Sequence, residues 1–315
     1  MCNHKAPHAP WQYAPRHEHM FDNVEIPEPE SLWEDQSHRS EGSRGYGFFI
    51  EKFAERAAAK NYPTGTLNTE GMTPKERRKA AYQKYLKDYL RTCAAVDESV
   101  GRLLNYLDKE GLTENTIVVY TSDQGLFLGE HNYIDKRWMY EESLRMPFLI
   151  RYPREIKPGS VSDEICLNID FAPTFLDYAG VPIPKYMQGR SFRPILQGKI
   201  PKNWRTSMYY RYWLQCSRPA HFGIRTKEYK LIFFYGQGLG KSPKISRDTT
   251  QNTKVGWELY DLRKDPKELK NEYNNPVYSE VIKELKKELR RLREELGDTD
   301  ENYPIMQEIL KKYWD

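Results

Sequence analysis

The segment from Thr121 to Pro153 holds the chain's densest group of side chains that could act on a metal ion or an anion. Asp123 and Gln124 come directly after an apolar run, residues 116–120, which we expect to form a buried strand. A carboxylate and an amide oxygen at the C-terminal end of a strand suit a hard cation such as calcium, because ligands gather at that edge of an α/β sheet. The alternative is a turn in which Asp123 accepts hydrogen bonds from nearby backbone N–H groups.

Three groups that can hold an anion follow in the next loop, namely His131, Lys136 and Arg137. Metal ligands followed by a cationic loop indicate chemistry on a sulfate or phosphate ester. Taken alone, a lysine such as Lys136 in a polar loop is usually solvated. Arg137 could equally pair with Glu141 or Glu142, which follow it closely in the sequence.

Four blocks of the sequence, in chain order, resemble the motifs of the type I sulfatases, which are formylglycine-dependent members of the alkaline-phosphatase-like superfamily. The first block is HKAPHAPW, and the second joins TSDQG, GEH and DKRWMYE. The third is NIDFAPTFLDYAGVPIP, and the fourth is HFGIRTKEYKLIFFY followed by WELYDLRKDPKELKN. The resemblance is greatest to carbohydrate sulfatases of the N-acetylglucosamine-6-sulfatase kind, which share APH-x-PW and IDKR-x-x-YE.

This resemblance implies a role for each matched residue. Lys136 would place a fixed positive charge on a sulfate oxygen and on the departing bridging oxygen. Asp123 and Gln124 would ligate calcium, with Gln124 standing where the family more often has asparagine. His8 would bind sulfate and protonate the leaving alcohol, which suits a side chain whose pKa lies near neutrality. The residues expected to contact the substrate are His131, Arg137, His221 and Arg225. A structural pair at a sheet edge is the alternative for the last two.

The nucleophile motif of the family has no match in this sequence. It reads Cys/Ser-x-Pro/Ala-x-Arg, and its first residue becomes formylglycine. None of the four cysteines fits it, and neither does any serine, while the family's Asp-Asp calcium pair is also absent. We therefore expect the chain to be the C-terminal two-thirds of a sulfatase, whether a truncated product, a fragmentary gene or one part of a split protein.

The composition of the chain argues against several other classes of protein. Of 315 residues, 38% are hydrophobic and 30% are charged, which is polar but globular. A net charge of +4 is too small to indicate a nucleic-acid partner. No apolar run reaches the length of a membrane span, and the polar N-terminus does not resemble a signal peptide. The family would place the protein in the periplasm, outside the cell or in the lysosome.

Element patterns divide the chain at about residue 203. The first 72 residues read as mostly loop, and such a long irregular stretch often lines a functional site. A helix should begin at Pro74 after the N-cap Thr73 and stop at Gly111. Strands are expected over residues 116–120, 147–152 and 165–169, followed by a short helix over 171–179 that is capped by Asp170.

Beyond residue 203, short aromatic runs predict an antiparallel sheet with strands over 207–213, 223–226, 229–235 and 257–261. Residues 236–254 read as a polar loop, and 276–296 as an amphipathic helix that packs on this sheet. The predicted class is α/β: part of an alkaline-phosphatase-like mixed sheet flanked by helices in residues 1–203, and a smaller α+β subdomain in 204–315.

The sequence therefore favours hydrolysis of sulfate esters on a sulfated sugar or glycosaminoglycan, with calcium and formylglycine as the family's cofactors. Two alternatives stay open at this point. One is a non-catalytic binding module that retains the sulfatase shell, and the other is a phosphate or phosphonate ester hydrolase of the same superfamily.

Overall fold

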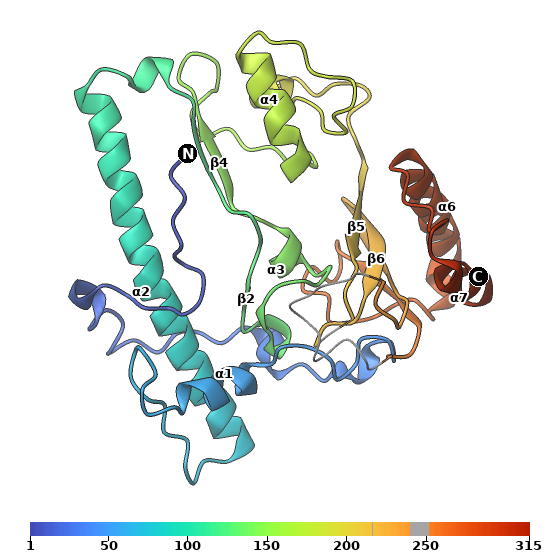
Figure 1. Ribbon diagram of the computed structural model, residues 1–315, viewed down its shortest axis with the longest axis horizontal. Helices are drawn as coiled ribbons and strands as arrows, with labels where there is room; N and C mark the ends of the chain where they lie inside the picture. The colour runs from blue at the N-terminus through green and yellow to red at the C-terminus, as the bar shows by residue number, and fades with distance from the viewer. Residues whose placement is uncertain (216, 240–251) are drawn as a thin grey trace. The chain divides into compact units, whose positions relative to one another are not determined.

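The computed structural model describes residues 1–215, 217–239 and 252–315 (Figure 1). These residues form two compact units, which we describe separately. Unit 1 comprises Met1–Glu34, Gly47–Val118 and Leu126–Lys136, and unit 2 comprises Asp35–Tyr46, Val119–Gly125 and Arg137–Asp315. The domain boundary that the sequence suggests at residue 203 stays a prediction.

The α-helices are α1 (Ile50–Ala57), α2 (Pro74–Lys109), α3 (Glu141–Leu144), α4 (Phe171–Tyr178), α5 (Arg193–Leu196), α6 (Ser279–Glu295) and α7 (Pro304–Tyr313). The strands are β1 (Val118–Thr121), β2 (Phe127–Leu128), β3 (Ile134–Asp135), β4 (Phe148–Arg151), β5 (Ser207–Tyr212), β6 (His221–Thr226), β7 (Tyr229–Phe234) and β8 (Gly256–Asp261). Short 3-10 turns precede or join several of them, among them η2 (Glu30–Trp33), η5 (Glu130–Asn132), η6 (Asn168–Asp170) and η7 (Pro276–Tyr278).

Unit 2 is built around the antiparallel sheet β5-β6-β7-β8, in which each strand pairs with the next one along the chain. One face of this sheet packs on α6, whose apolar stripe includes Ile282, Leu285 and Leu289. Trp257 and Trp314 complete the same core. The predicted sheet and the predicted packing of the helix on it are both confirmed. The predicted polar loop, residues 236–254, falls mostly outside the described residues.

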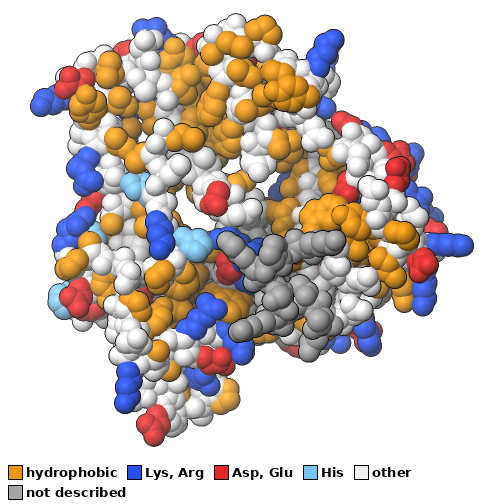
Figure 2. Space-filling model, viewed as in Figure 1, with side chains coloured by type: hydrophobic (Ala, Val, Ile, Leu, Met, Phe, Trp, Pro, Cys, Tyr) orange, Lys and Arg blue, Asp and Glu red, His pale blue; other side chains and the backbone are white. Residues whose placement is uncertain are grey.

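The predicted strands at the end of α2 and after Pro147 are present as β1 and β4, and they pair with each other. The expectation that the first of them is buried is wrong. Tyr120 is 41% exposed, and Leu149 on β4 is 68% exposed. Hydrophobic side chains on and next to α4 are exposed as well, including Phe175, Val181 and Ile183 (Figure 2).

The strand predicted over residues 165–169 does not form. The chain instead makes η6, because the buried carboxylate of Asp170 gathers donors from three places. It accepts hydrogen bonds from the backbone N–H groups of Leu167 and Arg190 and from the guanidinium of Arg205. Asp170 precedes α4 as expected, but its side chain makes no capping bond to that helix. Gly180 ends α4 in the left-handed region, with φ of 68°.

In unit 1, α2 begins as the sequence predicts. Thr73 and Glu76 form a capping box, in which each side chain binds the other's backbone N–H, and Pro74 occupies the first turn. The helix α1, which the sequence did not reveal, lies beside α2 and buries Phe53. Trp11 packs edge-on against Phe53 and Tyr85, so the segment that carries His8 is anchored in the core of this unit.

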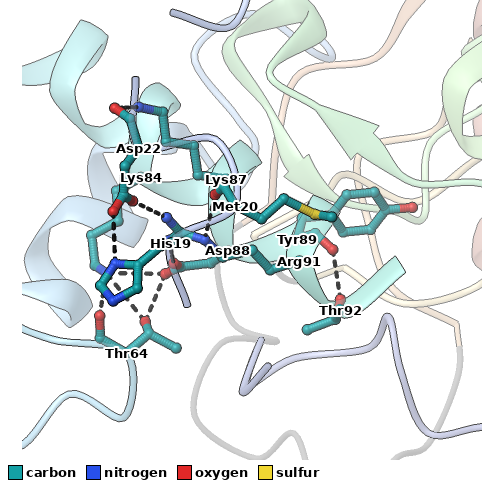
Figure 3. A network of polar contacts seen from close by, with 10 residues as sticks. All are labelled: His19, Met20, Asp22, Thr64, Lys84, Lys87, Asp88, Tyr89, Arg91 and Thr92. Carbon is teal, nitrogen blue, oxygen red and sulfur yellow. Dashed lines mark hydrogen bonds and ion pairs between the residues drawn. The ribbon is translucent and has the colours of Figure 1, made fainter. Parts of the chain in front are cut away.

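A polar network also ties the N-terminal segment to α2 (Figure 3). The carboxylate of Asp88, which is buried, accepts from Thr64 at 2.6 Å and pairs with Lys84 at 3.0 Å. Arg91 reaches Asp88 at 3.4 Å and Asp22 at 2.6 Å, and it also donates to the carbonyl of Met20. Because these partners lie far apart in the sequence, the network fixes an irregular stretch that has no regular hydrogen-bond ladder of its own.

Candidate functional site

The loop that leads to Lys136 in unit 1 has an unusual backbone. Gly129, His131, Asn132 and Asp135 all adopt positive φ, at 106°, 57°, 60° and 73°. A non-glycine residue held there costs about 1–3 kcal/mol and persists only where its surroundings impose the conformation. Three such residues within five positions therefore require strong support from the rest of the unit.

Two buried side-chain contacts supply part of that support. His131 is 0% exposed, and its Nδ1 lies 2.5 Å from Oε2 of Glu34, whose side chain is also buried. The amide of Asn132 donates to Glu51 on α1, with 3.1 Å to Oε2. Sequence analysis assigned His131 to the substrate and missed Glu34. The burial of His131 favours a role in holding this loop, while its contact with substrate stays a prediction.

The two residues of unit 1 predicted to act on the sulfate ester differ in environment. Lys136 is mostly buried, with 15% of its side chain exposed, and its Nζ lies 3.7 Å from Oδ1 of Asp135. His8 is exposed, in a turn where its backbone N–H donates to the carbonyl of Lys5. Its Nδ1 lies 2.8 Å from the carbonyl oxygen of Ala9, which leaves Nε2 as the ring nitrogen directed elsewhere.

The proposed metal ligands belong to unit 2. Asp123 and Gln124 are both exposed, and the hydroxyl of Ser122 donates to the Gln124 carbonyl at 2.8 Å. Within the described residues, the Asp123 carboxylate makes no hydrogen bond or ion pair, so the alternative role as a turn cap is not seen. Only glycine fits at the next position, Gly125, because a Cβ there would lie 2.2 Å from the Glu142 carbonyl oxygen.

A carboxylate and an amide oxygen fit calcium in kind but not in number. Calcium takes about six to eight oxygen ligands. Across residues 1–215, 217–239 and 252–315, no three His, Cys, Asp or Glu side chains group closely enough to hold a metal ion. Asp123 and Gln124 could therefore supply only part of a calcium shell.

Arg225 occupies a buried ionic cluster of unit 2. Its Nε and Nη2 each lie 3.1 Å from an oxygen of Glu141, in a two-point pair. The same carboxylate lies 2.9 Å from Nζ of Lys230, which also lies 2.6 Å from Glu268. Burial opposes ionisation of Glu141, yet Lys230 and Arg225 outweigh it and lower its pKa to about 2. Arg225 thus has a structural partner in Glu141, although β6 is an inner strand of the sheet and not an edge. Contact of Arg225 with a substrate stays a prediction.

His221 lies in an aromatic pocket of the same unit, beside Trp138 and Phe234. It is 0% exposed, and its Nδ1 contacts the Pro219 carbonyl at 2.8 Å. Burial lowers the pKa of His221 to about 4, so the ring is neutral near pH 7. Its Nε2 then carries a lone pair, and this atom has no hydrogen-bond partner among the described residues. Because the ring is enclosed, contact of His221 with a substrate stays a prediction.

Arg137 is exposed at the start of unit 2, with φ of 81°. Its backbone N–H donates to Ser143 Oγ at 3.0 Å, and the same hydroxyl accepts from the N–H of Trp138. The carboxylate of Glu141, one of its two suggested partners, is taken up by Arg225 and Lys230. The sequence indicates Glu141 only as a possible partner of Arg137. Its ion pairs with Arg225 and Lys230 could not be predicted, although the motif that contains Glu141 is recognisable.

Two family models, which together match most of the chain, show which family it belongs to. A model of the family described as Sulfatase matches residues 3–181, and one described as N-sulphoglucosamine sulphohydrolase, C-terminal, matches residues 129–295. The chain belongs to the sulfatase family. Members of this family generally use a metal ion and a formylglycine residue.

Two relatives show which sulfatases it resembles. It is 40% identical to an N-acetylglucosamine-6-O-sulfatase of Bacteroides thetaiotaomicron, over 95% of this chain and 58% of that protein. A solved structure of a protein in complex with its substrate D-glucosamine-2-N,6-O-disulfate is 38% identical, with a TM-score of 0.79, over 95% of this chain and 65% of that one. The chain thus spans less than two-thirds of the length of these relatives.

A more distant structure shows the shared fold alone. A phosphonate monoester hydrolase from Silicibacter pomeroyi is 22% identical with a TM-score of 0.67. The predicted α/β class of the alkaline-phosphatase-like kind is confirmed by these neighbours. Within the described part of the chain, none of the helices combines the length and the apolar character that crossing a membrane requires.

Proposed function

We propose that this chain serves the hydrolysis of sulfate esters on a sulfated sugar, and that a glucosamine unit sulfated at its 6-position is the preferred substrate. The observation that carries the proposal is the 40% identity to an N-acetylglucosamine-6-O-sulfatase over 95% of the chain. The match includes the segment in which Asp123, Lys136 and the left-handed loop occur. A glycosaminoglycan is the natural polymer class that contains such units.

Each predicted residue then has a chemical task. Lys136 holds a fixed positive charge toward the sulfate oxygens, and the supported loop keeps that charge in place. In its protonated form, His8 offers the N–H of Nε2 as the proton donor for the leaving sugar oxygen. Asp123 and Gln124 contribute oxygen ligands for calcium, which would neutralise negative charge on the sulfate when bound. Arg137, which is exposed, contributes a further cation.

The attacking group is the part of the reaction for which these residues offer no candidate. Covalent sulfate transfer needs an activated nucleophile, and no cysteine or serine of the sequence stands in the family's nucleophile motif. We infer that recognition of the sulfated sugar and protonation of the leaving group belong to this chain.

Calorimetric titration with glucosamine 6-sulfate and with unsulfated glucosamine, in the presence of calcium, tests the proposal. We expect the sulfated sugar to bind at least tenfold more tightly, and Lys136→Ala to abolish that preference. Lys185→Ala is a matched control, because Lys185 is a lysine outside the proposed site. Equal affinity for the two sugars in the unaltered chain would refute the proposal.

A further inference from the structure

Helix α6 carries a groove that it forms together with Trp314 and Asp315. The groove has a volume of about 410 Å³, and five cations line it, namely Lys283, Lys286, Lys287, Arg290 and Arg291. Two acidic side chains, Glu294 and Asp315, also reach it, so the lining has an excess of three positive charges. In Figure 2, blue side chains with red ones among them follow the margin where Figure 1 draws α6.

The floor of this groove holds a buried ammonium group. Lys286 is 8% exposed, and its Nζ donates to the carbonyl oxygen of Trp314 and lies 4.7 Å from the ring centre of Trp257. Within the described residues, no carboxylate lies within ion-pair distance of it. Burial lowers the pKa of Lys286, although the charge of Asp315 partly opposes this. A buried charge is normally paired, so this one lacks the anion that would usually accompany it.

Two neighbouring cations are also poorly compensated. Lys287 is exposed and has no carboxylate within 4.0 Å in the described part of the chain. Arg290 lies 3.8 Å from Asp315, at the limit of an ion pair, and over the ring of Trp314. The remaining two, Lys283 and Arg291, pair with acidic residues of their own helix. Exposed pairs of this kind contribute only about 0–1 kcal/mol, so an incoming anion can replace them.

We infer that this groove is a second binding site, which holds sulfate groups of a sulfated glycan chain. The inference rests on the proposed function for its choice of polyanion. Lys286, Lys287 and Arg290 lie within about one turn of the helix, so they can contact neighbouring anionic groups of one polymer. A single-stranded nucleic acid fits less well, because its bases stack on exposed aromatic rings, and Trp314, the ring that lines the groove, is buried.

The groove and His221 lie on opposite sides of the same sheet. Phe222 and Ile224 of β6 point into the core that α6 covers. Since side chains alternate along a strand, His221 and Arg225 point to the other face. One sugar cannot reach both places, so the groove would hold a distant part of the same polymer or a neighbouring chain. Its effect would be to keep the protein on a polymeric substrate, without changing how a single sugar binds.

The test compares two charge reversals that change the net charge equally. Lys287→Glu/Arg290→Glu alters the groove, whereas Lys199→Glu/Lys202→Glu alters an exposed loop elsewhere in unit 2. Binding is measured by calorimetry at fixed ionic strength with a heparin-derived octasaccharide, its desulfated form, inorganic sulfate and a DNA strand of equal charge. We expect the groove variant to bind the sulfated octasaccharide at least tenfold more weakly, and the loop variant to change its affinity less than twofold.

Several outcomes would overturn the inference. These are an unchanged affinity in the groove variant, equal binding of the desulfated form or of DNA, and displacement of the octasaccharide by inorganic sulfate at equal molarity. The last would mean that the groove takes only a single small anion. The groove variant separates the two proposals, because it should lose affinity for the octasaccharide while it keeps the preference for glucosamine 6-sulfate, which Lys136→Ala removes. Loss of the glucosamine 6-sulfate preference in the groove variant would also contradict a separate site.

Discussion

Removal of the buried cation Lys230 should expose the electrostatic strain in the cluster beneath Arg225. Its Nζ lies 2.9 Å from an oxygen of Glu141 and 2.6 Å from an oxygen of Glu268, so one ammonium group is shared by two carboxylates. Lys230→Met would keep the volume of the stem and leave two buried carboxylates near each other. Breaking a buried pair on one side costs about 3–5 kcal/mol. That is a large part of a typical free energy of unfolding, about 5–15 kcal/mol.

The cost should depend on pH. Burial raises the pKa of Glu268 to about 7 from its usual 4.5, against the opposing effect of Lys230. A carboxyl group that holds its proton more tightly when folded lowers the free energy of unfolding as the pH rises from about 4.5 to about 7. Without Lys230 the negative form of Glu268 is still less favourable. The loss in Lys230→Met should therefore be larger at pH 8 than at pH 5.

Urea unfolding followed by circular dichroism at the two pH values measures this loss. Lys230→Met/Glu268→Gln is the matched control, because it removes one negative charge together with the positive one, while Glu141 keeps Arg225. We expect it to recover at least half of the stability lost at pH 8. A loss below 1 kcal/mol in the single variant, or an equal loss at both pH values, would refute this account of the cluster.

Three further changes test other parts of the structure. Glu258→Ala should lower the free energy of unfolding by about 2–4 kcal/mol in thermal unfolding, because this buried carboxylate accepts from Ser40, Tyr140 and Tyr260, whose groups would lose their partner; a loss below 1 kcal/mol would contradict it. In a form that carries the formylglycine residue, Lys136→Ala should lower kcat/KM by the equivalent of roughly 2–4 kcal/mol, and a matching loss of melting temperature would mark Lys136 as structural. The chain should bind calcium weakly in calorimetry, since Asp123 offers only part of a shell; tight binding lost in Asp123→Ala would disprove this.

Elements with local signals could be predicted from the sequence. The start of α2 is indicated by Thr73, Pro74 and Glu76. Thr73 and Glu76 form a capping box within one turn, and Pro74 occupies the first helical position. The sheet β5-β6-β7-β8 follows from short aromatic runs separated by turn residues, and the stripe of α6 shows which face it buries. The helices α1 and α7 were missed because each is short. Helix α1 has no side-chain cap, and Pro304 at the first position of α7 was not recognised as the start of a helix.

The residues of the candidate site could be predicted from the sequence, but the contacts that hold them in place could not. His131 and Lys136 stand in a recognisable motif, whereas Glu34 lies 97 positions away from its partner His131. Arg225 and Glu141 are separated by 84 positions. Contacts of such range depend on the fold and leave no local pattern. The strand expected over residues 165–169 failed for the same reason, since distant Arg205 binds Asp170 and stabilises the turn.

The most direct test of the account is sulfate release by the purified 315-residue chain from glucosamine 6-sulfate with calcium present, measured in the samples used for binding. The account places recognition of the sulfated sugar in this chain and finds no nucleophile in its sequence. It predicts that the sugar binds and that no sulfate is released. Steady release of sulfate that disappears in His8→Ala would contradict it, because the attacking group would then lie among these residues.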